Sequence, residues 1–299
     1  MNGLGNLIRR NSKLYFKDKG MFFSSLITPI ILLVLYATFL AKVYRDSFAS
    51  AIPAGVNVPQ ALIDATAGSQ LFSSLLAVSC VTVSFCCNMV MVLDKVTGAY
   101  HDLTVTPVRR STLALGYYIA TLLSSALVCV VAYAACLLYI RGLGWYFTVQ
   151  DLLLVLLDVL LLVLFGTALS SLLNFFLTTQ GQISAIGTIV SAGYGFICGA
   201  YMPISQFGST VQRVVSFLPG TYGTSLLRMH AMRGVFREMA RLGFPSDLIV
   251  GIQDSIDCNL YFFGEKVSTP AMYLILCGTI VLLIAVYVLL NLRKKPRAE

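Results

Sequence analysis

Long uninterrupted apolar runs limit this chain to a membrane fold. Several of them reach the roughly 20 residues that an α-helix needs to cross the hydrocarbon core of a bilayer. Hydrophobic residues make up 58% of the 299 residues and charged residues only 11%, whereas about a quarter of the residues in an average soluble domain are charged. The pattern predicts an all-α polytopic protein embedded in the lipid bilayer. Its formal charge of +8 is therefore interpreted by position along the chain and not as a signal for nucleic acid.

Six apolar segments are predicted to be membrane-spanning helices. They lie at about 21–41, 69–93, 112–140, 152–174, 183–203 and 270–292. Because six is an even number, both termini are expected on the same side of the membrane. We expect one transmembrane domain over residues 1–299.

Basic residues near the ends of these segments set the expected orientation. With the termini in the cytoplasm, most basic residues close to a span end fall on the cytoplasmic side, as the positive-inside rule requires. The remaining ones lie largely within one long loop, where charge influences topology weakly. We therefore expect a multi-pass protein of the cell membrane with both termini cytoplasmic. The expected cytoplasmic basic residues are Arg9, Arg10, Lys13, Lys17, Lys19, Lys95, Arg109, Arg110, Arg293, Lys294, Lys295 and Arg297.

The segment 3–19 is predicted to be an amphipathic helix in the membrane interface. Its apolar and basic residues fall on opposite helical faces, so anionic lipid attracts the basic face. The alternative is a positively charged flank without regular structure. A cleavable signal peptide is disfavoured because the apolar run 21–41 is long for its h-region and follows about twenty polar residues. The apolar face holds Leu4, Leu7, Ile8, Leu14 and Tyr15, and the basic face holds Arg9, Arg10, Lys13 and Lys17.

The expected external loop, 204–269, has a helical pattern of its own. Within 224–243, apolar residues recur at helical spacing and most arginines fall opposite them. The pattern predicts a folded, partly helical loop that lies on the membrane surface. Its apolar stripe consists of Leu226, Leu227, Met232, Val235, Phe236 and Met239, and its polar side holds mainly Arg228, Arg233, Arg237, Glu238 and Arg241.

Motifs for nucleotide, hydrolytic or metal chemistry are missing from the sequence. It has no Gly-Lys dipeptide and hence no P-loop, and neither G-x-S-x-G nor H-E-x-x-H occurs. Its two histidines, His101 and His230, fall on opposite sides of the membrane in this topology. Of the eight cysteines only Cys258 lies in a polar loop, so no internal disulfide is expected. The chain is therefore not expected to be an enzyme, and a partner or an ion gradient must supply energy for any uphill work.

An organised polar segment, LDKVTGAYHDLTVTPVRRSTLALGYY (93–118), separates the second and third apolar segments. Residues 95–103 can form two helical turns, with Gly98 as the weak point. Pro107 forces Thr106 into an extended conformation, which ends the helix. A short helix at about 95–105, held between two spans, can transmit a push from a cytosolic protein. Periodicity alone leaves open a polar loop with positive-inside arginines.

This stretch resembles the first cytoplasmic loop of type-2 ATP-binding-cassette (ABC) export permeases. In that family a charged pair, a Gly, a Leu and a Thr-Pro-basic run form the coupling helix that docks on a separate ATPase. The resemblance implies that ATP and Mg bind to this partner chain, and that the permease pairs with a second copy or a homologous permease. The family more often has Glu at Asp94 and an acidic residue near His101, so the key contact stays open. The implied ATPase-coupling residues are Asp94, Lys95, Gly98, Tyr100, His101, Asp102, Leu103, Thr106, Pro107, Arg109 and Arg110.

A second resemblance follows the fifth apolar segment, in GAYMPISQFGSTVQRVVSFLPGTYGTSLLR (199–228). It is similar to the family's Gly-x-x-x-Pro turn, short re-entrant helical segment and Pro-x-x-Tyr step into an outer helix. The residues that carry this match are Gly199, Pro203, Pro219 and Tyr222.

Two features are candidates for a substrate path. Asp158 is the one acid well inside a predicted span, where it is either a cation or proton contact or an acid hydrogen-bonded to a neighbouring helix. The fifth segment carries a stripe of small residues, which serves close helix packing or lines a path between two subunits, as the resemblance implies for the second and fifth spans. The candidate path residues are Ser79, Val83, Cys86, Ser184, Ser191, Tyr194, Cys198 and Asp158.

The function expected from the sequence is that of an exporter permease. It moves a hydrophobic small molecule, lipid or peptide out of the cell by alternating access, energised by a separate ATPase. The alternatives are an ion-coupled secondary transporter and a membrane scaffold without transport. A secondary transporter usually shows an internal repeat and several buried ionisable residues, and here there is one such acid and no detectable repeat.

Overall fold

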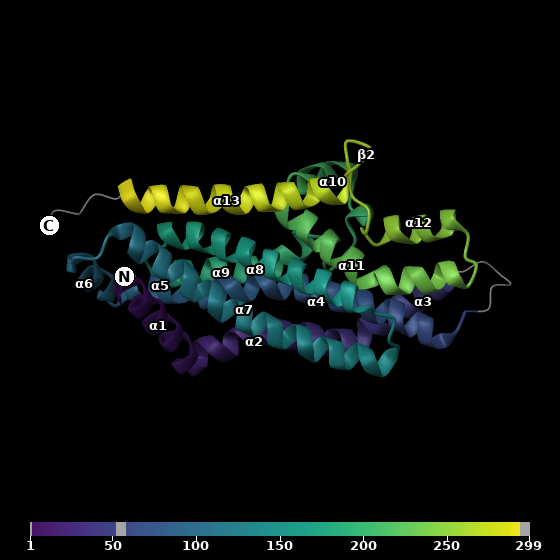
Figure 1. Ribbon diagram of the computed structural model, residues 1–299, viewed down its shortest axis with the longest axis horizontal. Coiled ribbons are helices and arrows are strands. Elements are labelled where there is room, and N and C mark those ends of the chain that lie inside the picture. The colour runs from purple at the N-terminus through teal and green to yellow at the C-terminus, as the bar shows by residue number, and fades with distance from the viewer. Residues whose placement is uncertain (1, 52–57, 294–299) are drawn as a thin grey trace.

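The computed structural model describes residues 2–51 and 58–293, and these residues are almost entirely helical. Long helices run side by side along one axis and form an elongated bundle (Figure 1). The beginning of α1 (Asn2–Lys17) and the end of α13 (Thr269–Arg293) lie near the same end, together with α6 (Ala99–Val105). We call this the α6 end. The opposite end, which carries α12 (Ser246–Ser255), is called the α12 end.

Five helices among the described residues are long and apolar enough to cross a membrane. The first joins α2 (Lys19–Leu35), a π-helical turn (Tyr36–Leu40) and the start of α3 (Ala41–Ala51). The second joins α4 (Gln60–Cys87) and α5 (Met89–Val96). The others are α7 (Arg110–Leu143), α8 (Val149–Phe176) and α13. These helices confirm a polytopic membrane protein.

The predicted fifth span, 183–203, corresponds to α9 (Gln180–Ile197) and is not among these five helices. Its 18 residues are long enough for a crossing, which takes roughly 17–25 residues, but Gln180 and Gln182 in its first turn and its several glycines and serines make it less apolar than the five helices. The helix ends before Gly199, whose φ of +74° reverses the chain. The chain continues through a 3-10 turn (Ile204–Gln206) and α10 (Ser209–Ser216) into α11 (Pro219–Arg241). A sixth crossing therefore stays a prediction.

Helix α4 is the centre of the bundle. It contacts α2, α7, α8, α9 and α11, so nearly its whole circumference is buried. Its sequence suits this position because small Ser, Ala, Cys and Val residues allow close helix approach. The backbones of α4 and α8 approach closely at Gly166 of α8, where a Cβ would lie 3.0 Å from the Cα of Val81.

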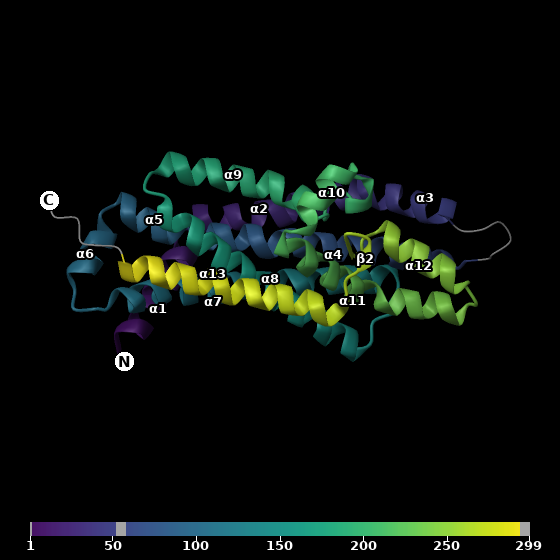
Figure 2. The same ribbon diagram turned by 90° about the horizontal axis from the view of Figure 1, so that it is seen from above.

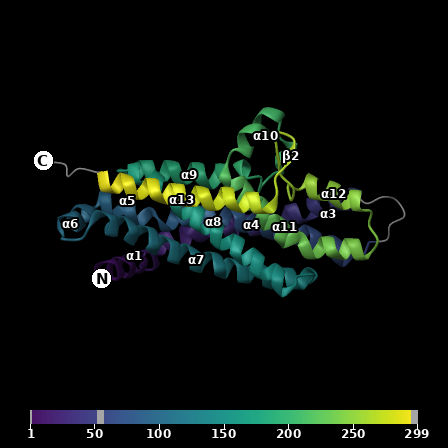
Figure 3. The ribbon, with the colours of Figure 1, turned by 45° about the horizontal axis from the view of Figure 1, so that its top comes forward.

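The loop 204–269 folds into helices, as expected, and the longest of them, α11, packs among other helices of the bundle. It runs lengthwise against α4, α8 and α13 (Figures 2 and 3). Its predicted apolar stripe is buried as expected, whereas Arg228, expected on the polar side, is only 1% exposed. Neighbouring helices therefore cover both the apolar stripe and Arg228, and the predicted position of the loop on the membrane surface stays a prediction. A short hairpin, Tyr261–Phe262 with Glu265–Lys266, precedes α13.

A second hydrophobic cluster forms the α12 end. It joins α3, the first turns of α4, the last turns of α11, and α12. Because these helices extend past the end of α7, the bundle has a helical cap there (Figure 2). The cluster includes Phe48, Leu62, Met232, Phe236 and Ile252.

Candidate functional site

The polar segment between the second and third long helices forms a bent arm at the α6 end. Helix α5 continues the second long helix to Val96, and Gly98 then adopts a left-handed conformation with φ of +84°. Helix α6 follows, and Thr106 is extended before Pro107. The helix expected at 95–105 is thus divided, since Lys95 belongs to α5 and α6 starts after Gly98. The bend turns α6 away from the axis of α5 (Figure 1).

The short helix α6 has an inner and an outer face. On the inner face, Tyr100 stacks on Tyr117 of α7 with ring centroids 6.4 Å apart, and Leu103 packs against the main core. Burial raises the pKa of Tyr100. On the outer face, His101 and Asp102 are exposed and Val105 is 72% exposed. Among the remaining predicted coupling residues, Thr106, Pro107 and Arg109 are exposed and Arg110 is half-buried.

Asp94 points into the protein and not toward this outer face. Its side chain is 7% exposed and receives two hydrogen bonds from Arg10 of α1, at 2.6 and 2.9 Å. Tyr117 of α7 donates a third, at 2.6 Å. The hydrogen bond to Asp94 raises the pKa of Arg10. Asp94 therefore joins α5 to α1 and α7.

Lys95 points in another direction, toward the end of α8. Its ammonium group donates to the carbonyl oxygens of Asn174, Phe175 and Leu177 at 2.7, 2.8 and 3.0 Å. The last carbonyls of a helix have no intrahelical partner, and a cation there also complements the helix dipole. Lys95 is thus a C-terminal cap for α8.

Asn88 marks the break between α4 and α5. Its amide donates to the hydroxyls of Ser170 and Ser171 of α8, both at 3.0 Å, and accepts from Thr121 of α7 at 3.3 Å. Asn174 donates to the Asn88 carbonyl at 3.2 Å. The sequence analysis missed this residue, although an Asn inside an apolar span is a signal for an interhelical hydrogen bond.

A groove opens between α2 and α9. It encloses about 970 Å³ and continues into a space of about 530 Å³ toward the α12 end, with Leu40, Tyr201 and Met202 lining both. Of the candidate path residues, Ser184 and Ser191 line the groove. Cys86 is half-buried, and Ser79, Val83, Tyr194 and Cys198 are buried.

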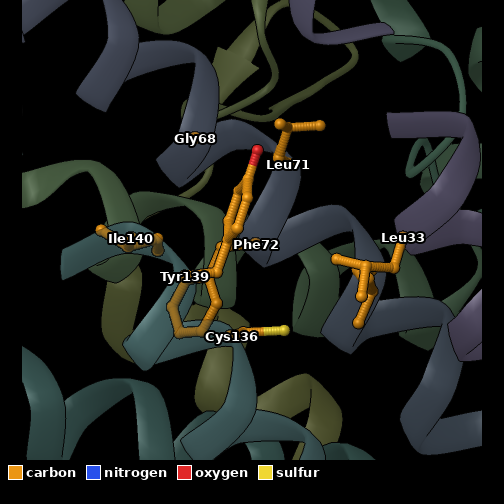
Figure 4. A pocket seen from close by; sticks show the side chains of 8 residues that line it. Leu33, Gly68, Leu71, Phe72, Cys136, Tyr139 and Ile140 are labelled. Atoms are coloured by element: carbon orange, nitrogen blue, oxygen red, sulfur yellow. The ribbon is translucent and has the colours of Figure 1, made fainter. Parts of the chain in front are cut away.

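A much smaller crevice lies on the other side of α2, against α7. Cys136 of α7 points toward Leu33 of α2 across its opening (Figure 4). The crevice holds only about 10 Å³ and has Leu71 and Phe72 of α4 in its wall. A second space on the α7 side, lined by Pro29 of α2 and Val131 of α7, holds about 260 Å³, so the larger space beside α2 is on its α9 side.

Asp158 lies away from the groove, in a contact among three helices. Its carboxylate is 2.6 Å from Nδ1 of His230 in α11, and Tyr273 of α13 donates to it at 2.7 Å. Asp158 is 1% exposed. Of the two interpretations from the sequence, this geometry matches the acid that is hydrogen-bonded to neighbouring helices.

The predicted re-entrant residues surround a buried ion pair. Arg228 of α11 donates to the carbonyl of Gly199 at 2.8 Å and lies 3.5 Å from Asp257. Asp257 accepts from the amide of Ile204 at 2.6 Å. Burial raises the pKa of Asp257, and the charge of Arg228 partly offsets this. Pro203 precedes the 3-10 turn, Pro219 is the first residue of α11, and Tyr222 donates to Ser216.

These features define a polytopic helical membrane protein with an anchored arm at one end. The chain belongs to the ABC-2 type transporter family, whose model matches residues 3–231. Proteins of this family are membrane permease domains without a nucleotide-binding site, and a separate ATPase hydrolyses ATP. The family binds no cofactor. The comparison with curated proteins gives no match.

Proposed function

We propose that this permease exports a hydrophobic small molecule, lipid or peptide, and that a cytosolic ATPase drives it through α6. The observation that carries the proposal is the two-faced arm. The inner face of α6 packs on α7, while the outer face of His101, Asp102 and Val105 is exposed at the extreme end of the bundle. A helix anchored on one side and exposed on the other can receive a push and pass it on.

The proposed topology places the α6 end in the cytoplasm. The first and last long helices both have their chain-terminal ends there, which agrees with the positive-inside pattern of the sequence. In this orientation α9 is the fifth crossing, and 198–218 form the re-entrant segment. Gly223 of α11 packs against Leu162, about 16 Å further along α8 than Asp151, so α11 begins well inside the bundle.

The groove between α2 and α9 supports a path for an apolar substrate. Its walls are largely aliphatic, and its small hydroxyl groups belong to Ser24, Ser184, Thr188 and Ser191. In a dimer with a second copy or a homologous permease, this groove would face the partner. Alternating access would then open the path between the two subunits first to the cytoplasm and then to the exterior.

The proposal is tested by co-purification in mild detergent. Photolabelling with azido-ATP should reveal an ATP-binding protein that co-purifies with the wild-type permease. Val105→Asp should abolish its recovery, because the change puts a charge on the outer face of α6. Val250→Asp is the matched control, since Val250 of α12 is 43% exposed at the opposite end. Equal recovery with both variants would exclude docking through α6.

The competing functions give different results in vesicles. An ion-coupled secondary transporter would move substrate when the purified chain alone is given an ion gradient. A scaffold would move none under any condition. The proposed exporter needs the ATPase and ATP together.

A further inference from the structure

Helix α5 is a short rod between an interruption within the second long helix and a bend just beyond the end of that helix. Asn88 interrupts the helix at one end of α5, and Gly98 bends the chain at the other. The eight residues of α5 extend about 12 Å. Any movement of α6 must pass through this rod to reach α4, or through α7 on the other side.

The rod is fixed to α1 by an ion pair in which Asp94 is buried and Arg10 is half-buried. Arg10 makes a two-pronged contact with Asp94, a geometry that adds both strength and direction to the hydrogen bonds. Helix α1 is itself well anchored, since Leu7 packs against Gly116 of α7 and Tyr15 hydrogen-bonds with Ser25 of α2 at 2.6 Å. The Arg10–Asp94 pair therefore connects α5 to a firmly held neighbour.

The rod is fixed to α8 by the next residue along the chain. Lys95 holds three carbonyl oxygens at the end of α8. Adjacent residues on a helix point about 100° apart, so Asp94 and Lys95 hold α5 on two sides. The carboxylate and the ammonium group are both occupied by partners within the same chain.

We infer that Asp94 and Lys95 are positioning residues, which transmit the movement of α6 to α1, α7 and α8 and do not contact the ATPase. The inference rests on the proposed function and differs from what the family resemblance implies for this charged pair. Arg10 and Tyr117 occupy the buried carboxylate of Asp94, and displacing Arg10 would leave that charge buried without its partner, which is strongly unfavourable. The outer face of α6 is left to make the docking contacts.

A residue that contacts the ATPase directly would change two measurable quantities together. One is the affinity of the permease for its ATPase. The other is the maximal ATP hydrolysis rate when the permease is saturated with ATPase. A positioning residue should change the second and spare the first.

The experiment titrates the co-purifying ATPase onto full-length permease variants in nanodiscs. Arg10→Gln and Asp94→Asn should keep the ATPase Kd within about twofold and lower the maximal stimulation of hydrolysis on the order of fivefold or more, the usual size of coupling between sites. Arg9→Gln is the matched control, because it removes the same charge from an exposed position of α1. It should retain stimulation close to that of the wild type.

A charge reversal shows whether the pair itself matters. Arg10→Asp combined with Asp94→Arg restores an opposite pair, and the Tyr117 hydroxyl can accept from the new guanidinium group. This double variant should recover most of the stimulation that either single change loses. Lys95→Met should behave like Asp94→Asn, with the Kd kept and the stimulation reduced.

A direct contact would give the opposite pattern. If Asp94→Asn weakened ATPase binding as strongly as Val105→Asp, the inward assignment would be wrong. Unchanged stimulation in Arg10→Gln and Asp94→Asn would also overturn it. If the proposed function itself were wrong, the result would be distinguishable, because Val105→Asp would then leave ATPase binding intact.

Discussion

The bend at Gly98 leads to a prediction about ATPase affinity, and the backbone conformation of Gly98 sets the magnitude of the expected change. Gly98 has φ of +84°, and a Cβ placed there would meet no atom within 4 Å. Replacing it by Ala therefore causes no clash and acts only on backbone conformation. In the bent arm, a left-handed conformation costs an L-residue roughly 1–2 kcal/mol. In a straight arm, Ala is better than Gly by about 1 kcal/mol.

These two effects favour the same outcome. Together they move the balance between bent and straight arms by about 2–3 kcal/mol, or roughly 30- to 150-fold, toward one continuous helix. A continuous helix would rotate the outer face of α6 and remove the stacking of Tyr100 on Tyr117. We expect Gly98→Ala to insert into the membrane normally and to lose at least about tenfold in ATPase affinity.

The assay is the same titration of ATPase onto permease in nanodiscs. Gly243→Ala is the control, because Gly243 has φ of +81° in open space at the α12 end and carries the same backbone cost. Gly98→Asn should fall between wild type and Gly98→Ala, since Asn tolerates the left-handed region. Wild-type affinity in Gly98→Ala would show that the bend does not position α6.

Three further predictions concern the buried contacts of α8, α11 and the loop that follows α11. Asp158→Asn should lower stability to thermal unfolding by about 1–3 kcal/mol, because the charge-assisted contact with His230 is lost. Unchanged transport by this variant at every pH would leave Asp158 a structural contact only. Arg228→Met should destabilise by about 3–5 kcal/mol, since it leaves the buried carboxylate opposite it unpaired, whereas Arg241→Met, at an exposed position, should have little effect. Burial raises the pKa of Cys258 to about 12, so an impermeant maleimide at pH 7 should label it only after denaturation.

The sequence was informative where local rules determine structure. A helix that crosses lipid needs a long apolar run, so the long helices could be predicted from the apolar segments. The end of α6 followed from Pro107, and Gly98 divides the expected helix at 95–105 at the position predicted to be its weak point, because these residues restrict or free the backbone directly. The predicted ATPase-coupling role of the segment remains to be tested.

Contacts between distant segments could not be predicted from the sequence. Arg10 and Asp94 are 84 positions apart, and His230 and Asp158 are 72 apart. Helical periodicity shows which face a residue occupies, but it does not show which helix packs against that face. The same limit applies to α11, where a single apolar stripe gave no indication that α4, α8 and α13 pack against the helix.

The extent of α9 could not be predicted either. Apolar residues continue from Ile197 to position 203, so the pattern extended the span that far. The helix stops because Gly199 adopts a left-handed conformation that is held by Arg228, a residue far along the chain. The hydropathy of the segment does not predict a contact with a residue so far along the chain.

Photocrosslinking from position 105 tests whether the outer face of α6 docks on a cytosolic ATPase. Val105→Cys would carry a photoactivatable maleimide reagent, and light would be applied to right-side-out and inverted membrane vesicles. If α6 docks on the ATPase, a membrane-impermeant reagent should reach position 105 only in inverted vesicles and should form an adduct with an ATP-binding protein. Labelling in right-side-out vesicles, or an adduct with no such protein, would contradict it.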